Sequence, residues 1–150
     1  PASLLRQLNN EICETISRGM FVTMLIGIYD SNKKELLLSN AGHEPPIILN
    51  DKNEFSNFNE AGPPLGIMAN TAYKEYKITF ENSSMYIFTD GITEIKNTEG
   101  EELGSLGFQN YITKYKDKPN NQRLKLIIDN VINSKYIQKD DLTIVVLDSV

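Results

Sequence analysis

Hydrophobic residues recur along this chain with two different spacings. Spacing of three and four residues predicts amphipathic helices, whereas alternating or continuous short apolar runs predict strands. By these patterns we expect helices at 3–17, 106–115 and 121–133, and strands at 20–30, 35–39, 47–49, 73–80, 84–89 and 142–147.

The segments between these elements predict how some of them connect. The polar stretch 31–34 is typical of a tight turn, so the strands on either side should form a hairpin. Strand 84–89 follows closely after 73–80 and is expected to pair with it. Glycine and two prolines exclude regular structure around 40–46, and the polar stretch 50–59 is interpreted mostly as loop.

Two apolar strands carry acidic groups at one end. Met-Tyr-Ile-Phe at 85–88 leads into Thr89, Asp90 and Gly91, and Asp140 and Asp141 precede the strand 142–147. Both strands are predicted to be buried on both faces. If they are antiparallel neighbours, Asp90 and Asp140 reach the same edge of the sheet. Two carboxylates about 4 Å apart repel by roughly 4 kcal/mol at an effective dielectric constant of about 20, and a divalent cation would reverse that repulsion.

Each acidic site also has a simpler interpretation. Asp90-Gly91 is a favoured two-residue hairpin turn, and Asp140-Asp141 is equally compatible with a solvated turn. A phosphatase with an aspartate nucleophile would need a second aspartate two positions later, where this chain has Ile92. Serine or cysteine catalysis would depend on the single histidine, His43, and no serine lies in a glycine-flanked elbow.

Composition narrows the choice of metal and of partner. The 150 residues suffice for one domain, and 15 basic against 20 acidic residues give a net charge of −5, which disfavours nucleic acid. One cysteine and one histidine exclude an internal disulfide and make a zinc site implausible. Any metal should therefore be hard and bound by oxygen: Mg²⁺, Mn²⁺ or Ca²⁺. The absence of a disulfide and of a long apolar run favours a cytoplasmic segment without membrane contact.

His43 and the arginines bear on phosphate binding. His43 lies in the Gly-His-Glu-Pro-Pro loop, where it either holds the turn by a hydrogen bond or assists catalysis. The arginines Arg6, Arg18 and Arg123 all fall on or just after predicted helices. A phosphate group in this chain would therefore rely on metal charge.

Six short motifs stand out along the chain: Met-Phe-Val-Thr at 20–23, Asn-Ala-Gly-His-Glu-Pro-Pro at 40–46, Pro-Leu-Gly at 64–66, Phe-Thr-Asp-Gly-Ile-Thr-Glu at 88–94, Gly-Glu at 100–101 followed by Gly104, and Asp-Asp-Leu-Thr at 140–143. In combination they resemble the bacterial sporulation stage II E-like phosphatases, a branch of the metal-dependent protein phosphatase 2C superfamily. Their order is that of the family, from the first helix to the last strand.

The resemblance implies an α+β fold, an antiparallel β-sandwich flanked by helices, with two Mn²⁺ or Mg²⁺ ions at one edge. These ions activate a water that attacks phosphoserine or phosphothreonine. Asp90 and Asp140 resemble metal ligands of the family, and Gly91 and Asp141 are expected to support them. His43 is at most an auxiliary catalytic residue by this comparison.

Family members also carry an earlier segment with a Gly-Asp pair and a Gly-His-Gly string, whose aspartate bridges both metals. That segment is absent from these 150 residues, so we expect the chain to be the C-terminal portion of one phosphatase domain, weakly active or inactive alone. The expected partner is a phosphorylated regulatory protein in bacterial signalling, with an upstream sensor domain and homodimerisation as further possibilities. The alternative is a non-catalytic phosphatase-like interaction module.

Overall fold

The structure, a computed structural model, describes residues 1–17, 19–58, 60–133, 136–138 and 140–149. Contacts between its residues divide the chain into two compact units. Unit 1 comprises Pro1–Pro45, Phe58–Asn82 and the C-terminal residues from Ser149, and unit 2 comprises Pro46–Asn57 and Ser83–Asp148. Each unit is described by itself.

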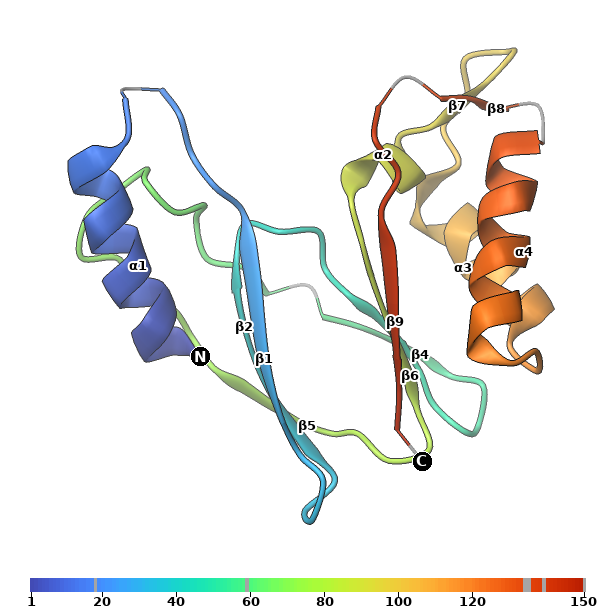
Figure 1. Ribbon diagram of the computed structural model, residues 1–150, viewed down its shortest axis with the longest axis horizontal. Coiled ribbons are helices and arrows are strands. Elements are labelled where there is room, and N and C mark those ends of the chain that lie inside the picture. Colours follow the sequence, from blue (N-terminus) through green and yellow to red (C-terminus); the bar gives the residue numbers. More distant parts are fainter. Residues whose placement is uncertain (18, 59, 134–135, 139, 150) are drawn as a thin grey trace. The chain divides into compact units, whose positions relative to one another are not determined.

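Unit 1 contains one helix and a three-stranded antiparallel sheet (Figure 1). Its elements are α1 (Ala2–Thr15), β1 (Met24–Asp30), β2 (Glu35–Ala41) and β5 (Tyr76–Thr79), with the strand order β1-β2-β5. The predicted hairpin is confirmed, since Asp30 pairs with Glu35. The Asp30 carboxylate closes the turn by accepting the amides of Asn32 at 3.0 Å and Lys33 at 3.2 Å, and the Lys33 amide in particular lowers the pKa of Asp30.

The core of unit 1 joins α1 to its sheet. Leu5 on α1 and Ala41 on β2 are fully buried, together with Leu65. Asn9 is also fully buried, yet its side chain is satisfied, because it donates to the Met68 carbonyl at 2.8 Å and accepts the Gly66 amide at 2.9 Å. The predicted amphipathic helix therefore contacts the core through leucine side chains, and the buried Asn9 side chain adds two hydrogen bonds to the backbone.

Unit 2 contains a four-stranded antiparallel sheet with the strand order β4-β3-β6-β9. The sheet elements are β3 (Ile47–Leu49), β4 (Phe55–Asn57), β6 (Ser84–Phe88) and β9 (Ile144–Asp148). The remaining elements are α2 (Asp90–Thr93), β7 (Lys96–Asn97), α3 (Gly104–Tyr115), α4 (Asn120–Asn133) and β8 (Tyr136–Ile137). None of the helices in the described ranges has the length and apolar character that crossing a lipid bilayer demands.

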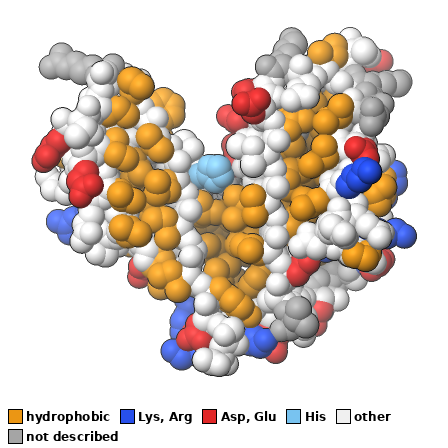
Figure 2. All heavy atoms as spheres, in the orientation of Figure 1, with side chains coloured by type: hydrophobic (Ala, Val, Ile, Leu, Met, Phe, Trp, Pro, Cys, Tyr) orange, Lys and Arg blue, Asp and Glu red, His pale blue; other side chains and the backbone are white. Residues whose placement is uncertain are grey.

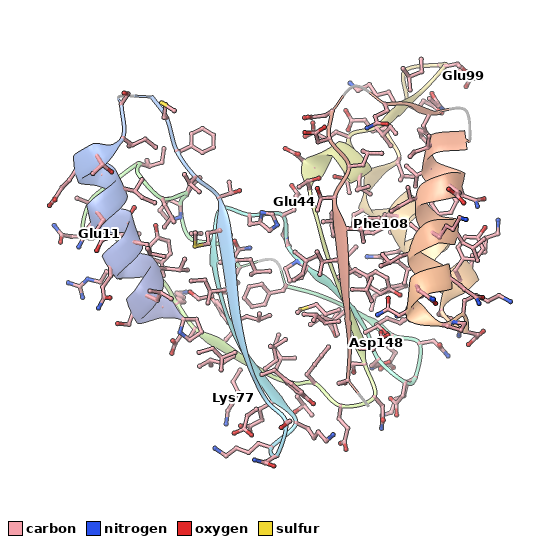
Figure 3. All side chains as sticks on the ribbon, viewed as in Figure 1. Glu11, Glu44, Lys77, Glu99, Phe108 and Asp148 are labelled. Carbon is pink, nitrogen blue, oxygen red and sulfur yellow. The ribbon has the colours of Figure 1, made fainter. Side chains whose placement is uncertain are left out.

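Helices α3 and α4 lie side by side next to the sheet of unit 2 (Figure 1) and bury its core. Phe108 of α3 is fully buried, and its ring meets those of Phe88 at 4.8 Å and Tyr86 at 6.3 Å between centroids (Figure 3). Ile127 and Val131 on α4 are fully buried in the same cluster, whereas Ile132, which the apolar spacing also assigns to the buried stripe, is 42% exposed. The helical periodicity thus identified the centre of the buried face of α4 but not its edge.

Two expectations about the strands are wrong. Strand β6 does not pair with β5, since β5 pairs with β2, whereas β6 lies between β3 and β9. Strand β9 is not buried on both faces, because Val145 and Leu147 are 47% and 46% exposed. In the described residues 50–58 the chain is mostly loop, as expected, and the exception is the short strand β4. Figure 2 shows that hydrophobic side chains also gather at the surface near α1 and β1.

Candidate functional site

The sheet edge predicted to carry the two acids is formed by β6 and β9. These strands are antiparallel neighbours, and their last pair is Phe88 with Ile144. Beyond that pair the Thr89 amide donates to the Thr143 carbonyl at 3.2 Å, and the Thr143 amide donates to the Thr89 hydroxyl oxygen at 3.2 Å. The predicted pairing of the two acid-tipped strands is therefore confirmed, and Asp90 and Asp140 follow at the same end of the pair.

Asp90 begins the short helix α2 at the end of β6. Its carbonyl accepts the Glu94 amide at 2.8 Å, and its side chain accepts the Gly91 amide at 2.9 Å. Asp90 is exposed, whereas Gly91 and Ile92 behind it are buried. The alternative interpretation of Asp90-Gly91 as a hairpin turn is wrong, because the chain continues into a helical turn that points the carboxylate outward.

Asp140 lies on the segment that enters β9. Its carboxylate accepts the Asp141 amide at 2.8 Å, and its carbonyl accepts the side-chain amide of Gln138 at 3.1 Å. The Asp141 carbonyl accepts the Thr89 hydroxyl at 3.2 Å. Asp141 thus ties its segment to the end of β6 through its backbone, while the exposed Asp140 carboxylate is held in an orientation set by the turn.

Gly91 lies close to the backbone of the other acidic segment. A Cβ atom added at Gly91 would lie 2.5 Å from the Asp141 carbonyl oxygen, a distance that backbone atoms do not tolerate. Only glycine allows the start of α2 to approach the Asp140-Asp141 backbone so closely. The residue therefore sets the spacing between the two carboxylate-bearing segments.

A pocket of about 270 Å³ opens beside this edge. It is lined by Gly91, Glu94, Ile95, Lys96, Ile137 and Asp140. Glu94, Lys96 and Ile137 were not candidates from the sequence. For Glu94 and Lys96, their position shortly after Thr89-Asp90-Gly91 was a signal in the sequence. For Ile137 the sequence contains no such signal, because this residue reaches the pocket through the β7-β8 pairing.

The donor set suits a hard cation. Asp90 and Asp140 offer carboxylate oxygens, and among the described residues only one oxygen of each accepts a hydrogen bond. Mg²⁺ and Mn²⁺ prefer such oxygen ligands. In the described part of the chain, however, no three His, Cys, Asp or Glu side chains come together as a metal cluster. Among the described residues, Asp90 and Asp140 therefore stand at this edge without a third metal-ligating side chain beside them.

His43 belongs to unit 1, in the loop that follows β2. The side chain of buried Asn40 brackets the residue, since it accepts the His43 amide and donates to the His43 carbonyl, both at 2.9 Å. The His43 ring lies 3.4 Å from the Thr23 hydroxyl through Nδ1. The loop is thus held mainly by Asn40 rather than by the imidazole, and an auxiliary catalytic role for His43 stays a prediction.

Sequence comparisons relate the chain to known proteins. Residues 1–149 match the profile of the family described as stage II sporulation protein E (SpoIIE). The chain is 30% identical over 150 residues to the phosphoserine phosphatase RsbU of Bacillus subtilis, covering 98% of this chain and 44% of that protein. It is 32% identical over 87 residues to the protein IcfG of Synechocystis, covering 57% of this chain and 14% of IcfG. The chain therefore spans less than half the length of these curated relatives.

Solved structures resemble this one over nearly its whole length. The PP2C domain of SiaA from Pseudomonas aeruginosa has a TM-score of 0.79 at 16% identity, over 99% of this chain and 60% of that chain. The phosphatase domain of SpoIIE from Bacillus subtilis has a TM-score of 0.66 at 18% identity, over 97% of this chain and 71% of that chain. The expected α+β fold of the protein phosphatase 2C type is confirmed.

Proposed function

The chain belongs to the stage II sporulation protein E family, and from this premise we propose that it forms part of a Mn²⁺- or Mg²⁺-dependent phosphatase that hydrolyses phosphoserine or phosphothreonine on a regulatory protein. The observation that carries the proposal is the pair of exposed carboxylates, Asp90 and Asp140, at one end of the β6-β9 pair. The proposed site of action is the bacterial cytoplasm.

In this proposal, Asp90 and Asp140 hold two hard cations together with ligands from outside the described residues. When bound, such ions supply Lewis-acid stabilisation of the phosphoryl group and lower the pKa of a water. The chain's own contribution is positional. The hydrogen bonds of Thr89 to the segment before β9 and the close approach at Gly91 fix the backbones that carry the two carboxylates.

The substrate class is supported by relatives. The Bacillus subtilis relative is named a phosphoserine phosphatase, and a solved Mycobacterium tuberculosis structure with a TM-score of 0.77 contains RsbU and RsbW domains. Metal dependence is supported by the magnesium complex of RsbX, whose fold matches with a TM-score of 0.65. We propose that this chain shares the phosphoserine substrate and the metal dependence of these relatives.

A second candidate function is a non-catalytic phosphatase-like interaction module. The finding that favours it is that no cluster of three metal-ligating side chains occurs in the described ranges. The two candidates differ in one measurable property, because a binding module has no need of a divalent cation at Asp90 and Asp140.

The test uses the full-length protein and has two readouts. Mn²⁺ binding is measured by calorimetry, and phosphate release from an aryl phosphate is measured as Mn²⁺ is added. Asp90→Asn and Asp140→Asn should each weaken Mn²⁺ binding and remove most activity while the circular dichroism spectrum is retained. Asp117→Asn, at an exposed site between α3 and α4, is the matched control. Wild-type Mn²⁺ affinity and activity in both edge variants would exclude the proposed metal site.

A further inference from the structure

The pocket beside the carboxylate edge contains one basic side chain among its lining residues, Lys96. Two acidic side chains, Glu94 and Asp140, line the same pocket, and Ile95 and Ile137 provide apolar wall. Under the proposed function, the cations at Asp90 and Asp140 neutralise the phosphate. Lys96 is then left to interact with another part of the substrate.

Backbone pairing fixes where Lys96 points. Lys96 pairs directly with Ile137 of β8 and also forms a bridge with Glu102. Residues directly opposite one another on neighbouring strands project from the same face. Lys96, Ile137 and Glu102 therefore share one face, which explains why Lys96 and Ile137 line one pocket and why Lys96 meets Glu102.

The loop that carries Lys96 is stiffened by its neighbour Asn97. The Asn97 side chain accepts the amides of Glu99 and Glu101, each at 2.9 Å, and the Asn97 backbone amide donates to the Glu101 carbonyl at 2.9 Å. Glu99 lies at the outer end of this loop (Figure 3). The turn therefore holds the backbone on both sides of the Lys96–Glu102 pair, while the Lys96 side chain itself is 47% exposed.

The ion pair of Lys96 shows that its ammonium group binds a carboxylate. Lys96 Nζ lies 3.1 Å from a Glu102 carboxylate oxygen, and the two side chains are 47% and 52% exposed. Such exposed pairs contribute little to stability and exchange readily with competing ions. A carboxylate of an incoming protein would therefore compete with Glu102 for the Lys96 ammonium, and Ile95 and Ile137 would contact the methylene groups of that residue.

From this arrangement we propose that Lys96 is a specificity-determining residue that pairs with an acidic residue flanking the phosphorylated residue of the substrate, and that Glu102 competes for the same ammonium. The inference rests on the proposed phosphatase function. It predicts opposite effects for the two members of one ion pair, since removing Lys96 weakens recognition of the acidic neighbour and removing the Glu102 charge strengthens it.

The experiment measures kcat/KM of the full-length protein with Mn²⁺ on phosphoserine peptides that carry Glu, Gln or Lys at each flanking position in turn. An aryl phosphate without flanking residues serves as the second substrate. At one position the wild-type protein should favour Glu over Lys by up to about fivefold, the upper end of the range for an exposed ion pair. Lys96→Met should abolish that preference, Lys96→Glu should reverse it, and Glu102→Gln should increase it. Lys125→Glu, at an exposed site on α4, controls for net charge.

Aryl phosphate turnover separates the two proposals. If every variant hydrolyses the aryl phosphate as the wild type does and all share one peptide preference, the role of Lys96 is overturned while the phosphatase function stands. If the wild-type protein hydrolyses neither substrate, the phosphatase function is overturned and this inference with it. A preference that falls in Lys96→Met and rises in Glu102→Gln supports the inference even if Lys96→Glu fails to fold.

Discussion

Gly91 and Asp141 approach each other so closely that a Cβ atom at Gly91 would lie 2.5 Å from the Asp141 carbonyl oxygen. This contact connects the start of α2 with the segment that enters β9. The spacing of Asp90 and Asp140 is therefore set by backbone packing, which cannot relax by a change of rotamer. Glycine is therefore needed at position 91 for this close approach, and not for the positive φ angle of a hairpin turn.

Gly91→Ala should separate the two acidic segments. The clash with backbone atoms should destabilise the protein by about 1–3 kcal/mol, as in other overpacked sites, and weaken Mn²⁺ binding. Urea unfolding and calorimetry measure the two effects. Gly107→Ala on α3 is the control, because the atoms nearest its added Cβ belong to the Leu103 side chain and not to the backbone. Unchanged Mn²⁺ affinity in Gly91→Ala would show that the Gly91–Asp141 contact does not position the proposed metal ligands.

Arg123 and Asp148 form an ion pair in which the arginine is buried. The Arg123 side chain on α4 is 5% exposed and donates to both carboxylate oxygens of Asp148 on β9, at 2.6 and 2.7 Å. Asp148→Asn should cost about 3 kcal/mol or more, because it leaves a buried guanidinium without its counter-charge. Lys77→Met, which breaks the exposed pair with Glu35, should cost at most about 1 kcal/mol. Urea unfolding that gives equal losses for both variants would contradict this ranking.

The acid-tipped edge was predictable because two apolar runs, each with an acidic end, leave few ways to pair. The other partner of β6, which is β3 rather than β5, was not predictable. Proximity in the chain favours a β5-β6 hairpin, yet Glu35 of β2 pairs with Thr79 of β5, and the chain passes from one unit to the other before β6. The hydrophobic pattern of two neighbouring strands does not show that β5 and β6 belong to different sheets.

The hydrophobic pattern could not predict the exposed face of β9 or the β7-β8 pairing, for different reasons. Ile144 to Leu147 is uniformly apolar, so nothing in the sequence marks Val145 and Leu147 as the exposed face of β9. Strands β7 and β8 have two residues each, too few for any periodicity. The pocket residue Ile137 depends on that pairing, so only the structure places it beside the carboxylate edge.

Asn40 should be more important than His43 for the loop after β2. Asn40 is 2% exposed, and its side chain satisfies both the amide and the carbonyl of His43. Asn40→Ala should lower the free energy of unfolding by about 1–3 kcal/mol, because two backbone groups lose their partner. His43→Ala removes only the 3.4 Å contact with Thr23 and should cost less than about 1 kcal/mol. A larger loss in His43→Ala, measured by urea unfolding, would assign the structural role to the imidazole instead.

Tyr86 should make the protein sensitive to alkaline pH. Its ring is fully buried beneath Arg123, and no described residue forms a hydrogen bond with its hydroxyl group. Burial raises the pKa of Tyr86 from 10.0 to about 12. Because the folded state favours the protonated phenol, this contribution to stability is complete below pH 10 and is lost as pH rises toward about 12.

Tyr86→Phe tests this contribution directly. The variant should match or slightly exceed the wild-type stability near neutral pH, because a buried hydroxyl group without a partner is removed. Above about pH 10 the wild type should lose up to about 1.4 kcal/mol more per pH unit than the variant. Urea unfolding across that range provides the measurement, with Tyr29→Phe, at a site that is 40% exposed, as the control. Parallel pH profiles for wild type and Tyr86→Phe would show that the buried phenol does not govern alkaline unfolding.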